Sequence, residues 1–256
     1  YHPSNSYIYI YGDMDVNERL EYLDREYLSD FDVSDVDIHA NIERQAAFDK
    51  PVYETKPYAI TEDESLEDNT YLSYNAVIGT SVDAKLYLAF QILDYALVMT
   101  PGAPVKQALL DAGISTDVYS SYETSLYQPV YSIVAKNSNS KEQGRFVSVI
   151  NDTLEKLVKD GINERTIEAG INYYEFKYRE ADYGPYPKGL MYYLTMMDSW
   201  LYDETKPFIH IEAGDTFDEL KKNARNGYFE KLIKEYLLDN NHKSIISLVP
   251  EYGLEK

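Results

Sequence analysis

The chain begins YHPSNSYIYIYGDMDVNERLEYL over residues 1–23, and this stretch decides how the rest of the sequence is interpreted. Residues 6–11 alternate and are rich in β-branched and aromatic side chains, which predicts a strand. Asp15 and Glu18 have the spacing of a capping box and predict a helix that ends near Ser29. A strand followed at once by a helix leaves no room for the element that the strand pairs with. We therefore expect these residues to close a domain whose body precedes them.

The composition is that of a globular and strongly acidic protein. The 256 residues are 44% hydrophobic and carry a formal net charge of −20, and residues 1–70 alone hold 18 acidic and 5 basic side chains. This charge argues against nucleic acid and against an anionic membrane surface as partners. The chain has no cysteine, which excludes disulfides and thiolate zinc sites and is compatible with a cytoplasmic location. No uninterrupted apolar run reaches the ~20 residues of a membrane span.

Residues 31–70 differ from the sequence on either side. Acidic residues are dense there, Pro51 and Pro57 interrupt the pattern, and TEDESLEDNT at 61–70 has no apolar face. A long segment without regular structure is unusual inside a compact domain. We therefore expect an acidic connector between two domains, with a short helix at about 40–48.

From residue 71 the pattern becomes regular. Ser81 and Ser140 are expected to be helix N-caps, and Pro250 is expected to end the last strand. The order of elements predicts an α+β fold, a two-layer α/β sandwich with an antiparallel-rich sheet and helices packed on one face. Strands are predicted at 71–80, 116–122, 126–136 and 242–250, and helices at 83–98, 104–113, 140–161, 164–180, 187–203 and 216–238.

Catalytic motifs are absent from the sequence. It contains no G-x-S-x-G elbow, P-loop, dinucleotide fingerprint, H-E-x-x-H or H-x-x-E-H. His39 and Glu43 have helical i, i+4 spacing but no third ligand in view, and we interpret them as part of an exposed connector helix. His210 and Glu212 lie two residues apart and are expected in a turn.

The segment Tyr183–Pro187 permits two interpretations. A tight turn between two helices with aromatic packing is the simpler one. The alternative is a tyrosine-lined wall of a peptide cavity, because tyrosine rings cover apolar surface while keeping a polar tip.

Several motifs together resemble one known family. Tyr1, Pro3, Asn5, Gly12 and Asp13 match the segment that closes the catalytic domain of the pitrilysin and insulinase zinc metallopeptidases, the inverzincins. PGAPVKQALLDAG at 101–113 resembles the helix that opens the corresponding part of the next domain. YYEFKYREADYGPYPKGLMYYLTMMDSWLYDE at 173–204 resembles the presequence-protease branch. The resemblance covers essentially the whole chain.

The resemblance implies a division of the chain and of its role. Residues 1–30 would be the C-terminal strand and helix of a truncated catalytic domain, 31–70 the connector, and 71–256 the second, non-catalytic sandwich domain. The family's catalytic domain binds zinc through H-x-x-E-H and a distant Glu, so zinc is expected in the parent protein and not in this segment. The parent is expected to be a metalloendopeptidase of unstructured peptides, and this segment alone is expected to be inactive. Its partners would be peptide substrates, the missing catalytic domain and the C-terminal half of the parent chain.

One binding feature of the family is carried over by the resemblance. In insulin-degrading relatives an exosite in the second domain anchors the substrate by adding a strand to a sheet edge. The matching positions are Gly102, Val118, Tyr119, Ser120 and Ser121. The family has paired glycines where this chain has Ser120 and Ser121, so an ordinary sheet edge remains the alternative.

A second reading of the whole chain also stays open. It could be a stand-alone, inactive peptidase homologue that acts as a peptide-binding or scaffold module. The coding sequence upstream of Tyr1 distinguishes the two readings, because only a peptidase parent would encode H-x-x-E-H there.

Overall fold

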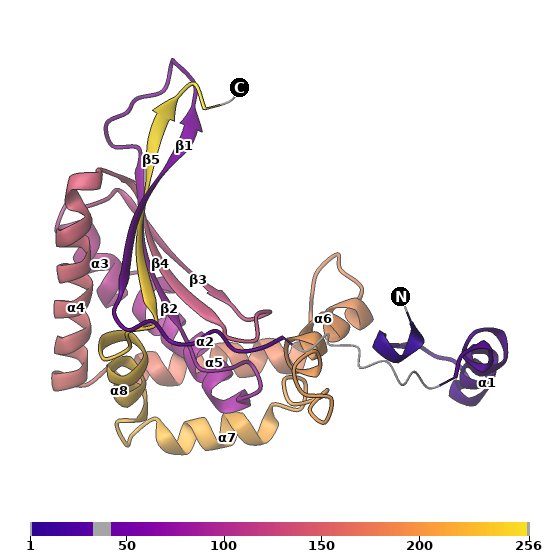
Figure 1. Ribbon diagram of the computed structural model, residues 1–256. Coiled ribbons are helices and arrows are strands. Elements are labelled where there is room, and N and C mark those ends of the chain that lie inside the picture. Colours follow the sequence, from indigo (N-terminus) through magenta and orange to yellow (C-terminus); the bar gives the residue numbers. More distant parts are fainter. Residues whose placement is uncertain (1, 33–41, 255–256) are drawn as a thin grey trace.

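The computed structural model describes residues 2–32 and 42–254, and its centre is one five-stranded sheet (Figure 1). Across the sheet the order is β1-β5-β2-β4-β3. β1 and β5 run parallel, and every other neighbouring pair is antiparallel. β1 and β5 also project beyond the other strands as a two-stranded arm (Figure 1). The strands are β1 (Val52–Ile60), β2 (Thr70–Val77), β3 (Asp117–Glu123), β4 (Val130–Ser138) and β5 (Lys243–Tyr252).

The helices cover one face of this sheet. On β2, Leu72, Tyr74 and Ala76 are fully buried in the core, whereas the residues between them are only half-buried. All helices except α1 and α6 contribute side chains to the same core. This confirms the predicted two-layer α/β sandwich. The helices are α1 (Val16–Glu26), α2 (Ala84–Asp94), α3 (Pro104–Asp111), α4 (Gln143–Asp160), α5 (Glu164–Glu180), α6 (Lys188–Trp200), α7 (Gly214–Asn223) and α8 (Tyr228–Leu232).

Helix α2 is the central helix of the core. Eight of its residues are buried, as its nearly continuous apolar sequence predicts, and π-helical turns extend it over Tyr95–Met99. Helix α5 packs closely on it at Gly170, where an added Cβ would lie 3.2 Å from Ile92 Cγ2 and from Tyr95 Cδ1. A glycine at this point lets the two helix backbones approach.

The predicted single helix at 216–238 is wrong. The structure has α7, then a break, then α8 followed by π-helical turns over Ile233–Leu238. The break is at Gly227, which has a φ of +69° and stands directly before α8. A left-handed residue cannot continue a right-handed helix, so the glycine divides the segment in two.

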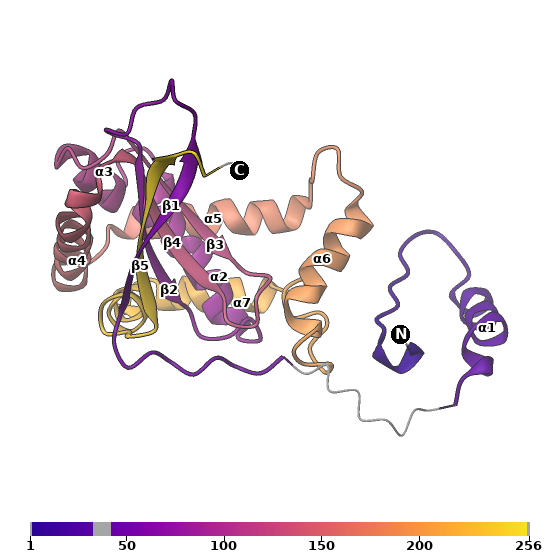
Figure 2. The ribbon, with the colours of Figure 1, turned by 45° about the horizontal axis from the view of Figure 1, so that its top comes forward.

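The predicted strand at 6–11 is also not formed. These residues make no ladder with any part of the described chain. The exposure of their side chains still alternates, because Tyr7 packs on Trp200 and Tyr9 packs on Tyr193. The ring centroids of these two pairs are 4.9 and 5.2 Å apart. Figure 2 shows residues 2–32 beside α6 and away from the sheet. The pattern predicted an extended backbone correctly, but a strand also needs a partner.

The acidic connector contains a strand that the sequence analysis missed. β1 occupies 52–60 and pairs with β5 along its whole length. Its side chains are mostly exposed, so no apolar alternation marks it, and Pro57 is tolerated because β1 is an edge strand. The predicted helix at 40–48 is absent from residues 42–48, and its first two residues lie outside the described chain. Instead, Gln45 exchanges two hydrogen bonds with the Gln128 side chain, at 2.6 and 3.2 Å.

Several predicted boundaries move. Asp83, not Ser81, caps α2, since its carboxylate accepts from the Leu86 N–H at 3.0 Å. Ser140 begins a 3₁₀ turn ahead of α4 and makes no side-chain cap. β4 begins at residue 130 rather than 126. β5 continues past Pro250 to residue 252. A proline is tolerated there because β5 pairs at that point with β1 alone, so one of its edges needs no N–H donor.

One helical stretch has the length and composition of a membrane span. It covers 84–111, and 61% of its most apolar window is buried inside the protein. The core helix of a soluble protein passes the same test, so the stretch is weak evidence for a membrane.

Candidate functional site

The predicted exosite strand, β3, is the last strand of the sheet on its side. It pairs with β4 and with no other strand in the described chain, so one of its edges carries unpaired backbone groups. Val118 is fully buried in the core, while Tyr119 is 42% exposed and Ser121 is exposed. A strand added to this sheet would pair with the backbone at the free edge of β3, while Val118 stays in the core.

Gly102 lies in a different place from the strand residues. It precedes α3 with a φ of +74°, and it lines a groove of about 550 Å³ between α3 and α4. None of the four β3 residues lines that groove. An added Cβ at Gly102 would meet no atom within 4 Å, so its conformation rather than crowding calls for glycine. The structure therefore does not join Gly102 and β3 into one cavity, although α3 and β3 touch.

A buried carboxylate lies beneath β3, and sequence reasoning missed it. Asp94 on α2 is 8% exposed. Burial raises its pKa, and the neighbouring hydroxyls of Ser120 and Tyr131 act in the opposite direction without reaching hydrogen-bond geometry. In the described chain, Asp94 Oδ1 and the Tyr131 hydroxyl are buried without a close partner. An acidic residue on a helix that is otherwise apolar was the available signal.

His210 and Glu212, the candidate pair that lies within the described residues, do not belong to a group that could hold a metal ion. His210 lies in a turn, as predicted, and is 2% exposed, while Glu212 is exposed. His39 lies outside the described residues, so the predicted His39–Glu43 pair has no structural description. Among residues 2–32 and 42–254, no cluster of three or more His, Asp or Glu side chains could hold a metal ion.

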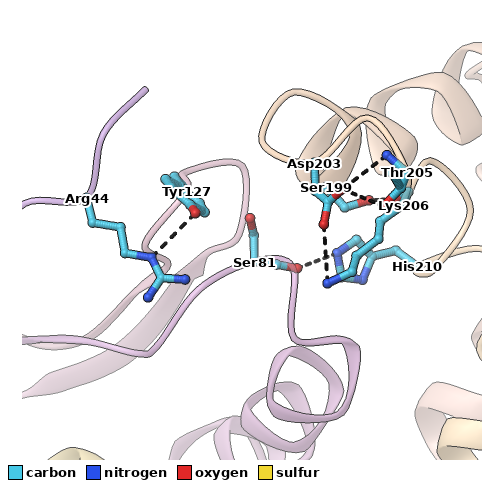
Figure 3. A network of polar contacts seen from close by, with 8 residues as sticks. All are labelled: Arg44, Ser81, Tyr127, Ser199, Asp203, Thr205, Lys206 and His210. Atoms are coloured by element: carbon cyan, nitrogen blue, oxygen red, sulfur yellow. Dashed lines mark hydrogen bonds and ion pairs between the residues drawn. The ribbon is translucent and has the colours of Figure 1, made fainter. Parts of the chain in front are cut away.

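His210 instead joins the loop after α6 to the start of α2 (Figure 3). Its Nε2–H donates to the Ser81 carbonyl oxygen at 2.8 Å, and its ring stacks on Tyr87 at 3.9 Å between centroids. Burial lowers the pKa of His210 to about 4, so the ring is neutral at pH 7. Tyr87 in turn donates to Asp198 at 2.8 Å. Burial raises the pKa of that aspartate.

The same loop has its own polar contacts. Ser199, which is fully buried, donates to the Lys206 carbonyl oxygen at 2.7 Å, and Lys206 Nζ lies 3.4 Å from Asp203 (Figure 3). These contacts fix the turn from which His210 enters the core. The site is a structural joint with one neutral imidazole.

The Tyr183–Pro187 segment is a turn between α5 and α6 with aromatic packing, as its simpler interpretation predicts. Tyr183 meets the edge of Tyr192 at 6.1 Å, and Tyr186 is 63% exposed. Two observations agree with the alternative interpretation, a tyrosine-lined wall of a cavity. Tyr183 lines a small cavity, and Pro187 lines a larger groove together with Tyr7, Tyr9 and Tyr11.

Known proteins define the class to which this architecture belongs. The family description "Peptidase M16 inactive domain" matches residues 1–174. "Protein HypA" of Clostridium perfringens is 42% identical over 256 residues, which is 100% of this chain and 26% of that protein. "Presequence protease 1, chloroplastic/mitochondrial" of Arabidopsis thaliana is 31% identical over 98% of this chain and 24% of its own length.

Solved structures share the fold. The M16 inactive domain from Pseudomonas fluorescens superposes with a TM-score of 0.55 at 12% identity, over 82% of this chain and 46% of that one. The class is therefore a metallopeptidase-type α/β sandwich of the non-catalytic kind. The chain belongs to the peptidase M16 family and matches its inactive domain. It spans about a quarter of the length of the curated relatives it matches.

Proposed function

We propose that this chain is the non-catalytic, substrate-chamber part of a zinc-dependent metalloendopeptidase that degrades unstructured peptides. Residues 1–30 would end the catalytic domain, 31–70 would connect the two domains and add β1 to the sheet of the second, and 71–256 would form the rest of the second domain. Membership of the M16 family supports this, as does the quarter share of its relatives' length. A cytoplasmic location, compatible with the lack of cysteine, is part of the same proposal.

The zinc of such an enzyme does not fit the described part of this chain. Zinc in a catalytic site needs several nitrogen or oxygen ligands converging on one point. His210 uses Nε2 for Ser81 and is stacked under Tyr87, and no other group of candidate ligands converges on it. In the proposal, zinc and the water that it activates therefore belong to the catalytic domain, and this chain contributes walls and binding surface.

The observation that carries the binding role is the unpaired edge of β3. A peptide that adds to a sheet edge is held by its backbone, so the site accepts many sequences. Tyr119 is exposed on this strand and could cover a peptide side chain. Ser120 and Ser121 are larger than the glycines of insulin-degrading relatives, so we expect weaker backbone access here than in those proteins.

Two proline variants test this edge and serve as controls for each other. Successive N–H groups of a strand point to opposite edges. Of Ser120→Pro and Ser121→Pro, one therefore removes an inward N–H that faces β4, and the other removes an outward N–H at the free edge. The outward variant should keep the melting temperature and lose binding of a fluorescent unstructured peptide. The inward variant breaks the ladder with β4 and should destabilise the fold. Unchanged peptide binding in the well-folded variant would contradict an exosite on β3.

The alternative proposal is a stand-alone, inactive homologue that binds peptides or acts as a scaffold. Contacts between residues 2–32 and α6 are compatible with it, because Tyr7 packs on Trp200 and Tyr9 packs on Tyr193 of the same chain. The coding sequence upstream of Tyr1 decides between the two. An encoded H-x-x-E-H supports the peptidase parent, whereas a start codon just before Tyr1 supports the stand-alone module.

A further inference from the structure

A small cavity lies behind the turn that joins α5 to α6. Its volume is about 120 Å³, and four tyrosines line it: Tyr87, Tyr178, Tyr183 and Tyr192. An engineered apolar cavity of about 150 Å³ in another protein binds benzene, so a space of this size suits one aromatic ring. Tyrosine rings favour edge-to-face or offset contacts with such a ring.

One of the residues that line the cavity has an unsatisfied acceptor. His210 lines it, and the Nδ1 atom of His210 is buried without a hydrogen-bond partner in the described chain. Nε2 carries the proton that Ser81 accepts, so Nδ1 of the neutral ring is an acceptor. The two ring nitrogens point out of different sides of the imidazole, and Figure 3 shows the second nitrogen turned away from Ser81. A buried acceptor without a donor is costly, and a ligand donor would remove that cost.

The rim of the cavity shows how a ligand would enter. Lys177 and Thr195 complete part of the lining, and Lys177 is exposed on α5. A lysine in the lining disfavours a cationic ligand and tolerates a neutral one. The ligand that matches all these features is therefore neutral and aromatic and carries one hydrogen-bond donor.

We propose that this cavity binds a phenol ring, such as a tyrosine side chain of a peptide, with its hydroxyl donating to His210 Nδ1. The ring would lie among the four tyrosines, and the hydroxyl would occupy the place opposite Ser81. This inference concerns binding in one cavity and does not depend on the proposed exosite on β3.

Titration of the ¹⁵N-histidine-labelled chain with phenol tests the inference at pH 7. Phenol should shift the His210 Nδ1 resonance upfield in a saturable way, because an acceptor nitrogen responds to a new donor. Benzene has the same ring without the donor and should bind about fivefold more weakly, as expected for one lost hydrogen bond of about 1 kcal/mol. His242 is the internal control, since its Nε2 is also buried without a partner but lies in another pocket.

Two variants make the result specific. His210→Phe keeps a ring against Tyr87 and removes the acceptor, so phenol and benzene should then bind equally, as monitored at the Thr195 amide. Thr195→Leu fills the cavity and should abolish binding of both. If His210→Phe does not fold, the loss of phenol binding in Thr195→Leu tests whether phenol binds in this cavity. Equal affinities for the two ligands in the unmodified chain, or no saturable shift at His210, would overturn the inference, as would phenol binding that survives Thr195→Leu.

Discussion

The buried His210 should make this protein less stable in mild acid. Burial lowers the pKa of His210 to about 4, against an ordinary value of 6.5 in the unfolded chain. The unfolded chain therefore binds the proton more tightly, and stability falls as the pH drops from about 6.5 towards 4. Between pH 7 and pH 5 the two pKa values give a loss of about 2 kcal/mol in the free energy of unfolding.

His210→Gln isolates this effect. The glutamine amide can still donate to the Ser81 carbonyl oxygen but does not titrate, so the variant should lose about 2 kcal/mol less than the unmodified chain between pH 7 and pH 5. Burial also lowers the pKa of His242, which leaves a slope of the same sign in both proteins. Burial raises the pKa of Asp198, which has the opposite sign and cancels in the comparison.

Urea denaturation followed by circular dichroism at the two pH values measures the difference. His2→Gln is the matched control, because His2 lies outside the core, and this variant should follow the unmodified chain. If His210→Gln and the unmodified chain lose the same free energy, the assignment of acid sensitivity to this joint is refuted.

Three further predictions concern packing and capping. Gly144→Ala should stabilise the chain by about 0.5–1 kcal/mol, because the added Cβ would meet no atom within 4 Å. Gly170→Leu should destabilise it by about 1–3 kcal/mol, because the larger side chain would force α5 away from α2. Urea unfolding measures both changes. Lys243→Met should cost about 2 kcal/mol in the same assay, because the buried ammonium donates to the Leu238 carbonyl oxygen at 3.1 Å and that acceptor would be orphaned. Asp15→Ala should cost helix α1 about 1 kcal/mol through the lost N-cap, seen as faster amide exchange in α1 alone, and unchanged exchange there would contradict the cap.

The helices of the core were predictable because their patterns are local. α5 spans the predicted range of about 164–180, since the Asn163 side chain caps its start and the apolar period continues along the helix. α1 was predicted from Asp15 and Glu18, and the Asp15 carboxylate does accept from the N–H groups of the first turn. In both cases the determining contacts lie within a few residues of one another.

The candidate site was predictable only in part. That β3 is a strand followed from its sequence, but its position at the edge of the sheet depends on the pairing order. The cavity at His210 brings residues 87, 178, 192 and 210 together, and no spacing in the sequence signals that approach. The groups that matter there come from three helices and a turn, so only packing could place them.

The sequence by itself determined the class of fold, because apolar periods, caps and turn residues are local signals. The family came from the resemblance of the segments at 1–13, 101–113 and 173–204 to known peptidases. Tertiary structure decided the two extended segments for which the sequence pattern was misleading. Residues 6–11 alternate clearly yet have no ladder partner in the described chain, whereas β1 hardly alternates and is a strand because β5 lies beside it. The physical reason is that a helix satisfies its backbone hydrogen bonds within itself, while a strand obtains them from a neighbour that can be distant in the sequence.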